Sequence, residues 1–316
     1  MKKKLYLSSM LLLLIVLAAF AQESSERRVN YIPLLKYDFL STDAHKIISP
    51  GAGLIIMKGE TKFVGFYTHH NISNALRFDY PQKFHSIDFL LETIKNRHQF
   101  LGIFQTDSDK PVSGGLHTFQ AATAYGYELT DNDKLSFVLG GGIAVSDFGI
   151  EFSNGKTCPL IPVPLIRAKY NNGFITTKFE FLTGPNFDLT IGAKSQFRLI
   201  NELRLDEFRD SRDLLFKSSL NYRFFSEEDP MGNFAGIALG IKNDNYGAFN
   251  LGDQQSKSDD EDTIEVHYNS IFGEIDLTFI KITGGHTFNG RKLYHGEITE
   301  NINEGYFISI EGMYQF

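Results

Sequence analysis

The stretch Tyr306-Phe307-Ile308-Ser309-Ile310-Glu311-Gly312-Met313-Tyr314-Gln315-Phe316 alternates two kinds of side chain. Positions 306, 308, 310, 314 and 316 are aromatic or β-branched, whereas Ser309, Glu311 and Gln315 between them are polar. Successive side chains of a strand point to opposite faces, so the segment predicts a strand with one apolar and one largely polar face. It stops on an aromatic residue, and aromatic residues mark the two membrane interfaces of transmembrane barrel strands.

This segment resembles the C-terminal β-signal by which outer-membrane barrels are handed to the β-barrel assembly machinery. The resemblance implies that this machinery is a partner of the chain and reads Tyr306, Ile308, Ile310, Tyr314 and Phe316. The alternative is an edge strand of a soluble protein that ends on Phe by chance.

The first residues have the features of a secretory signal peptide. Lys2, Lys3 and Lys4 precede an uncharged apolar run from Met10 to Ala18, and Ala19-Phe20-Ala21 fits the small-x-small cleavage pattern. We expect cleavage after Ala21 and a mature chain, 22–316, that forms one domain. An uncleaved membrane helix is the alternative, but the apolar run is short for the about 20 residues that a span needs.

Composition bounds the class of protein. The 316 residues carry a formal net charge of -7, and this acidic balance argues against a nucleic-acid partner. The sequence has one cysteine, so it cannot form an intramolecular disulfide. After the leader no apolar run approaches the 18 residues of a membrane helix, which excludes a helical membrane protein. Barrel strands escape this test because only every second residue faces lipid.

The middle of the chain shows the alternation most clearly, in residues 175–181, 187–199 and 214–224. One face of these segments is apolar and is expected to meet lipid: Phe179, Phe181, Leu189, Ile191, Phe216, Leu220, Tyr222 and Phe224. The other face carries charged and amide side chains and is expected to line the lumen: Lys178, Glu180, Asp188, Lys194, Gln196, Arg198, Lys217 and Arg223.

Strand length favours a membrane barrel over a soluble sandwich. Strands of soluble proteins average about five or six residues, whereas the alternation here holds for about nine to thirteen residues, enough for the about 9–11 residues that a transmembrane strand needs. The sequence therefore predicts an all-β fold, a transmembrane antiparallel up-and-down barrel of about 12 strands (10–14), located in the outer membrane. Residues 84–96 fit a short helix as well as a strand. A soluble barrel with its apolar face inward remains the alternative, because periodicity does not distinguish inside from outside.

The chain also resembles the loosely related, uncharacterised outer-membrane β-barrels of a Gram-negative-type envelope that are grouped as a domain of unknown function. The resemblance rests on Leu139-Gly140-Gly141-Gly142 with Ser146-Asp147-Phe148, on Pro162-Val163-Pro164-Leu165, and on the terminal segment. It implies a barrel and its location, and no activity.

The sharpest candidate for chemistry is the segment His69-His70-Asn71-Ile72-Ser73-Asn74. It is similar to the His-x-Ser-Asn stretch of barrel esterases, the outer-membrane phospholipase and lipid A deacylases, and this resemblance implies Ser73 as nucleophile. The spacing does not fit: His70 and Ser73 fall on opposite strand faces, and His69 lies about 13 Å from Ser73 along a strand. We therefore predict no catalytic residue, no metal site and no cofactor.

The sequence thus predicts an outer-membrane barrel that contacts outer-membrane lipids and passes small solutes passively, or has a structural or surface-loop role. A barrel lipid hydrolase and a soluble periplasmic β-protein are the alternatives, and the oligomeric state is not predicted.

Overall fold

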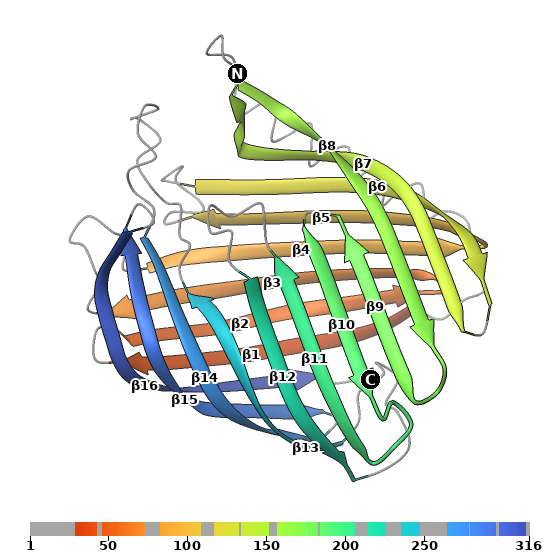
Figure 1. The fold of residues 1–316 in the computed structure, drawn as a ribbon. Coiled ribbons are helices and arrows are strands. Elements are labelled where there is room, and N and C mark those ends of the chain that lie inside the picture. Colours follow the sequence, from red (N-terminus) through yellow and green to blue (C-terminus); the bar gives the residue numbers. More distant parts are fainter. Residues whose placement is uncertain are drawn as a thin grey trace.

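The computed structural model describes residues 29–42, 46–73, 83–108, 117–132, 134–151, 157–182, 184–205, 214–224, 235–246, 264–277, 279–294 and 297–313. Within these residues sixteen antiparallel strands close into one barrel, in which every strand pairs with its sequence neighbours and β1 pairs with β16 (Figure 1). The expected leader, Ala19 and Ala21 included, lies outside the described residues, as do Tyr314 and Phe316. No helix among the described residues is long and apolar enough to cross a bilayer.

The strands alternate direction around the barrel. They are β1 (Val29–Thr42), β2 (Lys46–Lys58), β3 (Thr61–Ser73), β4 (Lys83–Lys95), β5 (His98–Ser108), β6 (His117–Asp131), β7 (Leu135–Glu151), β8 (Thr157–Asn171), β9 (Ile175–Phe181), β10 (Pro185–Ile191), β11 (Phe197–Leu205), β12 (Leu214–Arg223), β13 (Gly236–Tyr246), β14 (Ile264–Asp276), β15 (Ile280–Tyr294) and β16 (Glu297–Met313).

The prediction of an all-β antiparallel barrel is confirmed, and the count of about 12 strands is wrong. One error lies in residues 187–199, which were predicted as a single strand. Gly192 has φ +78, and residues 192–196 form a turn between β10 and β11. Because the turn has five residues, the odd-numbered positions are apolar both before it, at Ile191, and after it, at Leu199. The alternation of apolar and polar residues therefore continues through the turn and does not reveal it.

A second error is β8, which the alternation did not predict. Its residues 157–165 pair with β7 alone, because the ladder to β9 begins at Ile166 and Phe181. Prolines are tolerated at a strand edge that has no partner, since they have no N–H to donate. Pro162 and Pro164, two residues apart, fall in this half of the strand.

Residues 84–95 of the segment 84–96, which fitted a helix or a strand, lie in strand β4. Residues 201–205 continue β11, and residues 264–276 form the single strand β14.

The exterior of the barrel is apolar. Leu139 on β7, Leu220 on β12 and Leu239 on β13 are 48%, 57% and 71% exposed, and Tyr306, Ile308 and Ile310 of β16 point outward as well. The alternate positions of the strands face the interior and include Arg223 on β12, Ser270 on β14 and Thr287 on β15. Apolar side chains therefore cover the outside of the barrel, and polar side chains are enclosed in it.

One half of the interior is filled by side chains. A buried apolar cluster joins β5 to β8 and the β9–β10 turn: Leu101, Ala122, Ala124, Ala144, Val163, Leu165 and Leu182. Beside this cluster Arg167 of β8 crosses the interior. Its guanidinium lies 2.8 Å from Glu92 of β4, 3.0 Å from Gln99 of β5 and 2.6 Å from Glu180 of β9. Arg167 thus connects β8 and β9 with β4 and β5 across this half of the interior. The unfilled space lies in the other half.

Candidate functional site: a mixed-charge cavity in the barrel

A polar cavity of about 460 Å³ occupies the other half of the interior, against the inner face of β9 to β15. Figure 1 shows the first of these strands, β9 to β12 in green, in front of the orange and yellow far wall. Eighteen residues line the cavity: Thr176, Lys178, Asp188, Thr190, Ala193, Arg198, Ile200, Glu202, Lys217, Ser219, Asn221, Tyr222, Arg223, Gly236, Ile237, Glu274, Asp276 and Lys281. Five of them are cationic and four are acidic, so both signs face the same space.

The strand register arranges part of these charges in a row. Asp188 of β10 is directly opposite Lys178 on β9 and Glu202 on β11. Glu202 is in turn opposite Lys217 on β12. Directly opposite side chains in antiparallel strands are close neighbours. Two carboxylates therefore lie side by side with a lysine at each end of the row.

Glu274 of β14 holds the centre of a second group. Its carboxylate lies 3.5 Å from Lys281 Nζ and 3.8 Å from Lys217 Nζ, and it accepts a hydrogen bond of 3.2 Å from Thr283. The Glu274 side chain is only 13% exposed, so these pairs are shielded from bulk water better than surface pairs are. These contacts hold the Glu274 carboxylate in one position on the inner face of β14.

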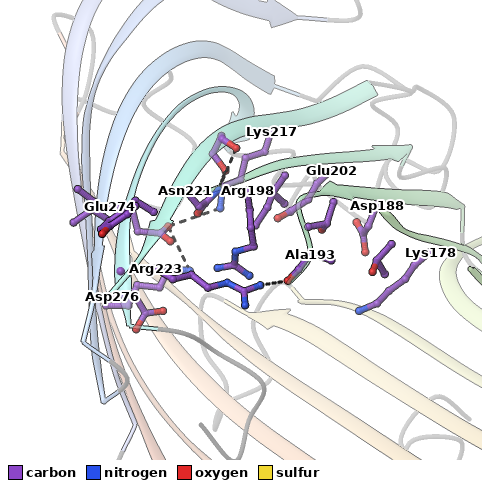
Figure 2. A pocket seen from close by; sticks show the side chains of 18 residues that line it. Lys178, Asp188, Ala193, Arg198, Glu202, Lys217, Asn221, Arg223, Glu274 and Asp276 are labelled. Carbon is purple, nitrogen blue, oxygen red and sulfur yellow. Dashed lines mark hydrogen bonds and ion pairs between the residues drawn. The ribbon is translucent and has the colours of Figure 1, made fainter. Parts of the chain in front are cut away.

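Arg223, at the end of β12, holds the β10–β11 turn against the cavity. Its guanidinium donates to the carbonyl of Ala193, and its backbone N–H donates to the carbonyl of Gln196 at 2.9 Å. The side chain is 6% exposed. Figure 2 shows Glu274 and Asp276 on one side of the cavity, Lys178 and Asp188 on the other, and Arg198 and Arg223 between them. A solute that carries both charges would meet partners for each.

The structure places the eight predicted lumen residues in three environments. Lys178, Asp188, Arg198, Lys217 and Arg223 line the cavity. Glu180 faces the interior on the packed side, where it pairs with Arg167. Lys194 and Gln196 lie in the exposed turn 192–196 and not on a strand, because the predicted strand 187–199 is interrupted there.

Sequence reasoning missed four charged lining residues. Glu202 lies between the alternating segments 187–199 and 214–224, where the sequence shows no clear alternation. Glu274 and Asp276 alternate with Ile275, and Lys281 alternates with Ile282, which is 40% exposed on the outer face. Residues 271–279 and 280–288 read as strand material in the sequence, and applying the period of two to them would have found these three residues.

Ser73 and the histidines near it are not brought together. His70 faces the interior, where its Nδ1 lies 2.8 Å from Ser49 Oγ and its Nε2 lies 3.1 Å from Ser86 Oγ. The Ser73 hydroxyl instead donates to the carbonyl of Lys46 at 3.4 Å. The strand register therefore separates Ser73 from the base that the esterase resemblance requires.

The closed ladder, the apolar exterior and the charged interior define the class of protein. In a bilayer a sheet must close on itself, so that no backbone edge meets the hydrocarbon, and its outward side chains must be apolar. An even number of antiparallel strands is the rule for single-chain outer-membrane barrels. The chain is thus a transmembrane β-barrel of the outer-membrane type.

Comparison with known proteins agrees on the fold. Neither a family model nor a curated protein matches the sequence. Among solved structures, CdiB from Acinetobacter baumannii matches with a TM-score of 0.50 and 10% identity over 90% of this chain. The match spans 60% of the length of CdiB.

Two further structures match over most of both chains. The outer membrane protein OprD from Pseudomonas aeruginosa has a TM-score of 0.39 and 7% identity, covering 91% of this chain and 94% of its own. The P. putida toluene transporter TodX has a TM-score of 0.34 and 7% identity, covering 93% and 91%. At such low identities the likeness concerns the fold alone.

Proposed function

We propose that this barrel is a passive channel for small polar solutes, with the cavity along β9 to β15 as its narrow section. The observation that carries the proposal is the lining itself, in which cationic and acidic side chains face one enclosed space. Buried charges are costly unless they are paired or hydrated. A set of this size on one wall is better suited to water and charged solutes than to a packed core.

The side chains that fill one half of the interior narrow the proposed passage. Barrels of 16–18 strands commonly enclose an aqueous channel, but here the Arg167 contacts and the apolar cluster occupy part of the interior. Phe272 and Phe307 are also almost fully buried inside the barrel. We therefore expect a low-conductance channel that favours small solutes.

Single-channel recording in planar bilayers tests this proposal. The full chain, folded in detergent, is first checked for a change of gel mobility on boiling, which identifies an intact barrel. We expect small, discrete conductance steps, and swelling of proteoliposomes in small polar solutes. A heat-modifiable barrel that inserts and stays silent in both assays would overturn the channel proposal.

Two further expectations stand beside the channel. We propose that the chain is not a lipid hydrolase, because among the described residues the Ser73 hydroxyl donates to the Lys46 carbonyl and not to a histidine, and His70 lies between Ser49 and Ser86. A phospholipid-hydrolysis assay of the wild type and of Ser73→Ala tests this, and activity that is lost in the variant would contradict it.

We also propose that the assembly machinery binds the terminal segment, whose Ile308 and Ile310 share one outward face on β16.

A further inference from the structure

The outer face of β2 to β5 carries its cations at its two ends. Nearest the β2–β3 and β4–β5 turns are Lys58 and Lys95, the last residues of β2 and β4. At the other end are Lys46 and Lys83, and His69 and His85 lie between them on β3 and β4. Between the two ends the outward positions are mainly apolar or small, and include Ile56, Phe63, Phe89 and Phe104.

Contacts show that side chains at the end away from the β2–β3 and β4–β5 turns point outward. Lys46 Nζ lies 5.2 Å from the centroid of the Phe39 ring, and Phe39 in turn packs at 5.6 Å on Tyr306, which is 55% exposed. Tyr67, 41% exposed, contributes a hydroxyl 2.5 Å from His85 Nδ1. His69 and His85 face each other across the strand pair, with ring centroids 4.7 Å apart.

Hydrogen-bonding groups complete this surface, which we call the basic patch (Lys46, His69, Asn71, Ser73, Lys83 and His85). Asn71 is directly opposite Lys83, and Ser73 is directly opposite Lys46. Cationic and neutral donors thus lie next to one another, immediately beyond the aromatic residues of the barrel wall.

The patch has no acidic counterpart on its own strands. Among the described positions, the outward faces of β2 to β5 include neither Asp nor Glu, because Asp88, Glu92 and Asp107 occupy inward positions. The exposed Glu304 is on β16, and β1 separates that strand from β2. The local charge is therefore positive on a chain whose net charge is -7.

The position of the patch along the barrel indicates which lipids it meets. Most connections at the end where β1 begins and β16 finishes are short, among them residues 59–60, 96–97, 132–134 and 172–174, with 224–235 as the exception. The patch lies at the opposite end, where short connections such as 43–45 alternate with the longer ones 74–82, 109–116 and 247–263. In outer-membrane barrels the short turns are periplasmic and the longer loops are extracellular. The patch then lies at the level of the outer-leaflet headgroups.

We propose that the basic patch binds the phosphate groups of outer-leaflet glycolipids. Ammonium groups form charge-assisted hydrogen bonds to phosphate oxygens, and basic residues at a membrane surface attract anionic lipid headgroups. The aromatic rings of Phe39, Tyr67 and Tyr306 lie against the patch, where a lipid would place the boundary between its headgroup and its chains. The patch would therefore fix lipid molecules on one side of the barrel.

Binding of bisphosphorylated lipid A to the full chain in detergent tests the proposal, measured by native mass spectrometry. The double variant Lys46→Gln/Lys83→Gln should bind the lipid about 30-fold more weakly, since each basic residue at a membrane surface contributes about a factor of five. The matched control Lys58→Gln/Lys95→Gln removes the same charge from the same two strands at the periplasmic end. This control should retain the affinity of the wild type.

Two outcomes would overturn the proposal. Equal losses in both double variants would mean that the lipid responds only to overall charge. Equal binding of lipid A from which the phosphates have been removed would mean that the acyl chains alone are recognised. Each variant is first shown to change its gel mobility on boiling as the wild type does, so that a folding defect is not taken for weak binding.

Discussion

At the scale of single residues, the cavity is organised by a few charged side chains whose positions follow from the register. Glu274 is the clearest example, because one carboxylate contacts Lys217, Lys281 and Thr283. The sequence pattern predicted Lys217 but not its partner. Alternation assigns a face to a residue, whereas the partner of a charge depends on which strands are neighbours and how far each is shifted along the next.

Replacing Glu274 by Gln should shift the ion selectivity of the channel toward anions. The change removes one negative charge from the cavity and leaves Lys217 and Lys281 without their shared carboxylate. The measurement is the reversal potential across a bilayer in a KCl gradient. Glu60→Gln, in the exposed β2–β3 turn, changes the net charge equally outside the cavity and should leave the potential unchanged. Identical potentials for the two variants would argue that Glu274 does not face the conduction path.

At the scale of the strands, alternation located most strands but missed their ends and one turn. It works where a strand has a lipid face and a lumen face, as in β12 and β16, because the two faces then need opposite side chains. It fails at the β10–β11 turn, where Ala193 continues the odd-numbered small or apolar positions in an irregular segment. It also fails in β8, where Pro162 and Pro164 are compatible with a strand because half of one edge is unpaired.

Gly192→Ala should destabilise the barrel by about 1–2 kcal/mol. Gly192 has φ +78, a left-handed conformation that costs an L-residue about this much, and an added Cβ would lie 2.5 Å from the carbonyl oxygen of Phe197. The free energy of unfolding is measured by urea titration of the protein in lipid vesicles. Gly141→Ala on β7 is the control, since a Cβ there meets only the Val163 carbonyl, at 3.5 Å. If both alanine variants lost similar amounts of unfolding free energy, the positive φ of Gly192 would not be the cause of the loss.

At the scale of the whole molecule, sequence periodicity separates two faces but does not tell which one is outside. A soluble barrel and a membrane barrel have the same alternation, and they differ in whether the apolar set is enclosed. In the closed ladder the apolar set is exposed, with Leu220 at 57% and Leu239 at 71%. The inside therefore has to accommodate Arg223, Glu274 and Lys281, and the paired charges of the cavity follow from this requirement.

The outward orientation is tested by placing a charge on the lipid face. Leu220 is six residues after the start of the ten-residue strand β12, so it lies near the middle of the span. An arginine at the bilayer midplane of a barrel costs about 2–4 kcal/mol. Leu220→Arg should therefore lower the free energy of unfolding in lipid vesicles by that amount, as measured by reversible urea titration.

Leu220→Ala separates the loss of the leucine from the burial of a charge in lipid. It removes the same side-chain contacts without introducing a charge, and it should cost less than the arginine variant. If the arginine variant instead matched the alanine variant, position 220 would face water. The apolar faces of β12 and of its neighbours β11 and β13 would then need another cover, because Leu220 is directly opposite Leu199 and Leu239 in the two ladders. That result would contradict the membrane-spanning orientation of this wall and, with it, the proposed passage of solutes along β9 to β15.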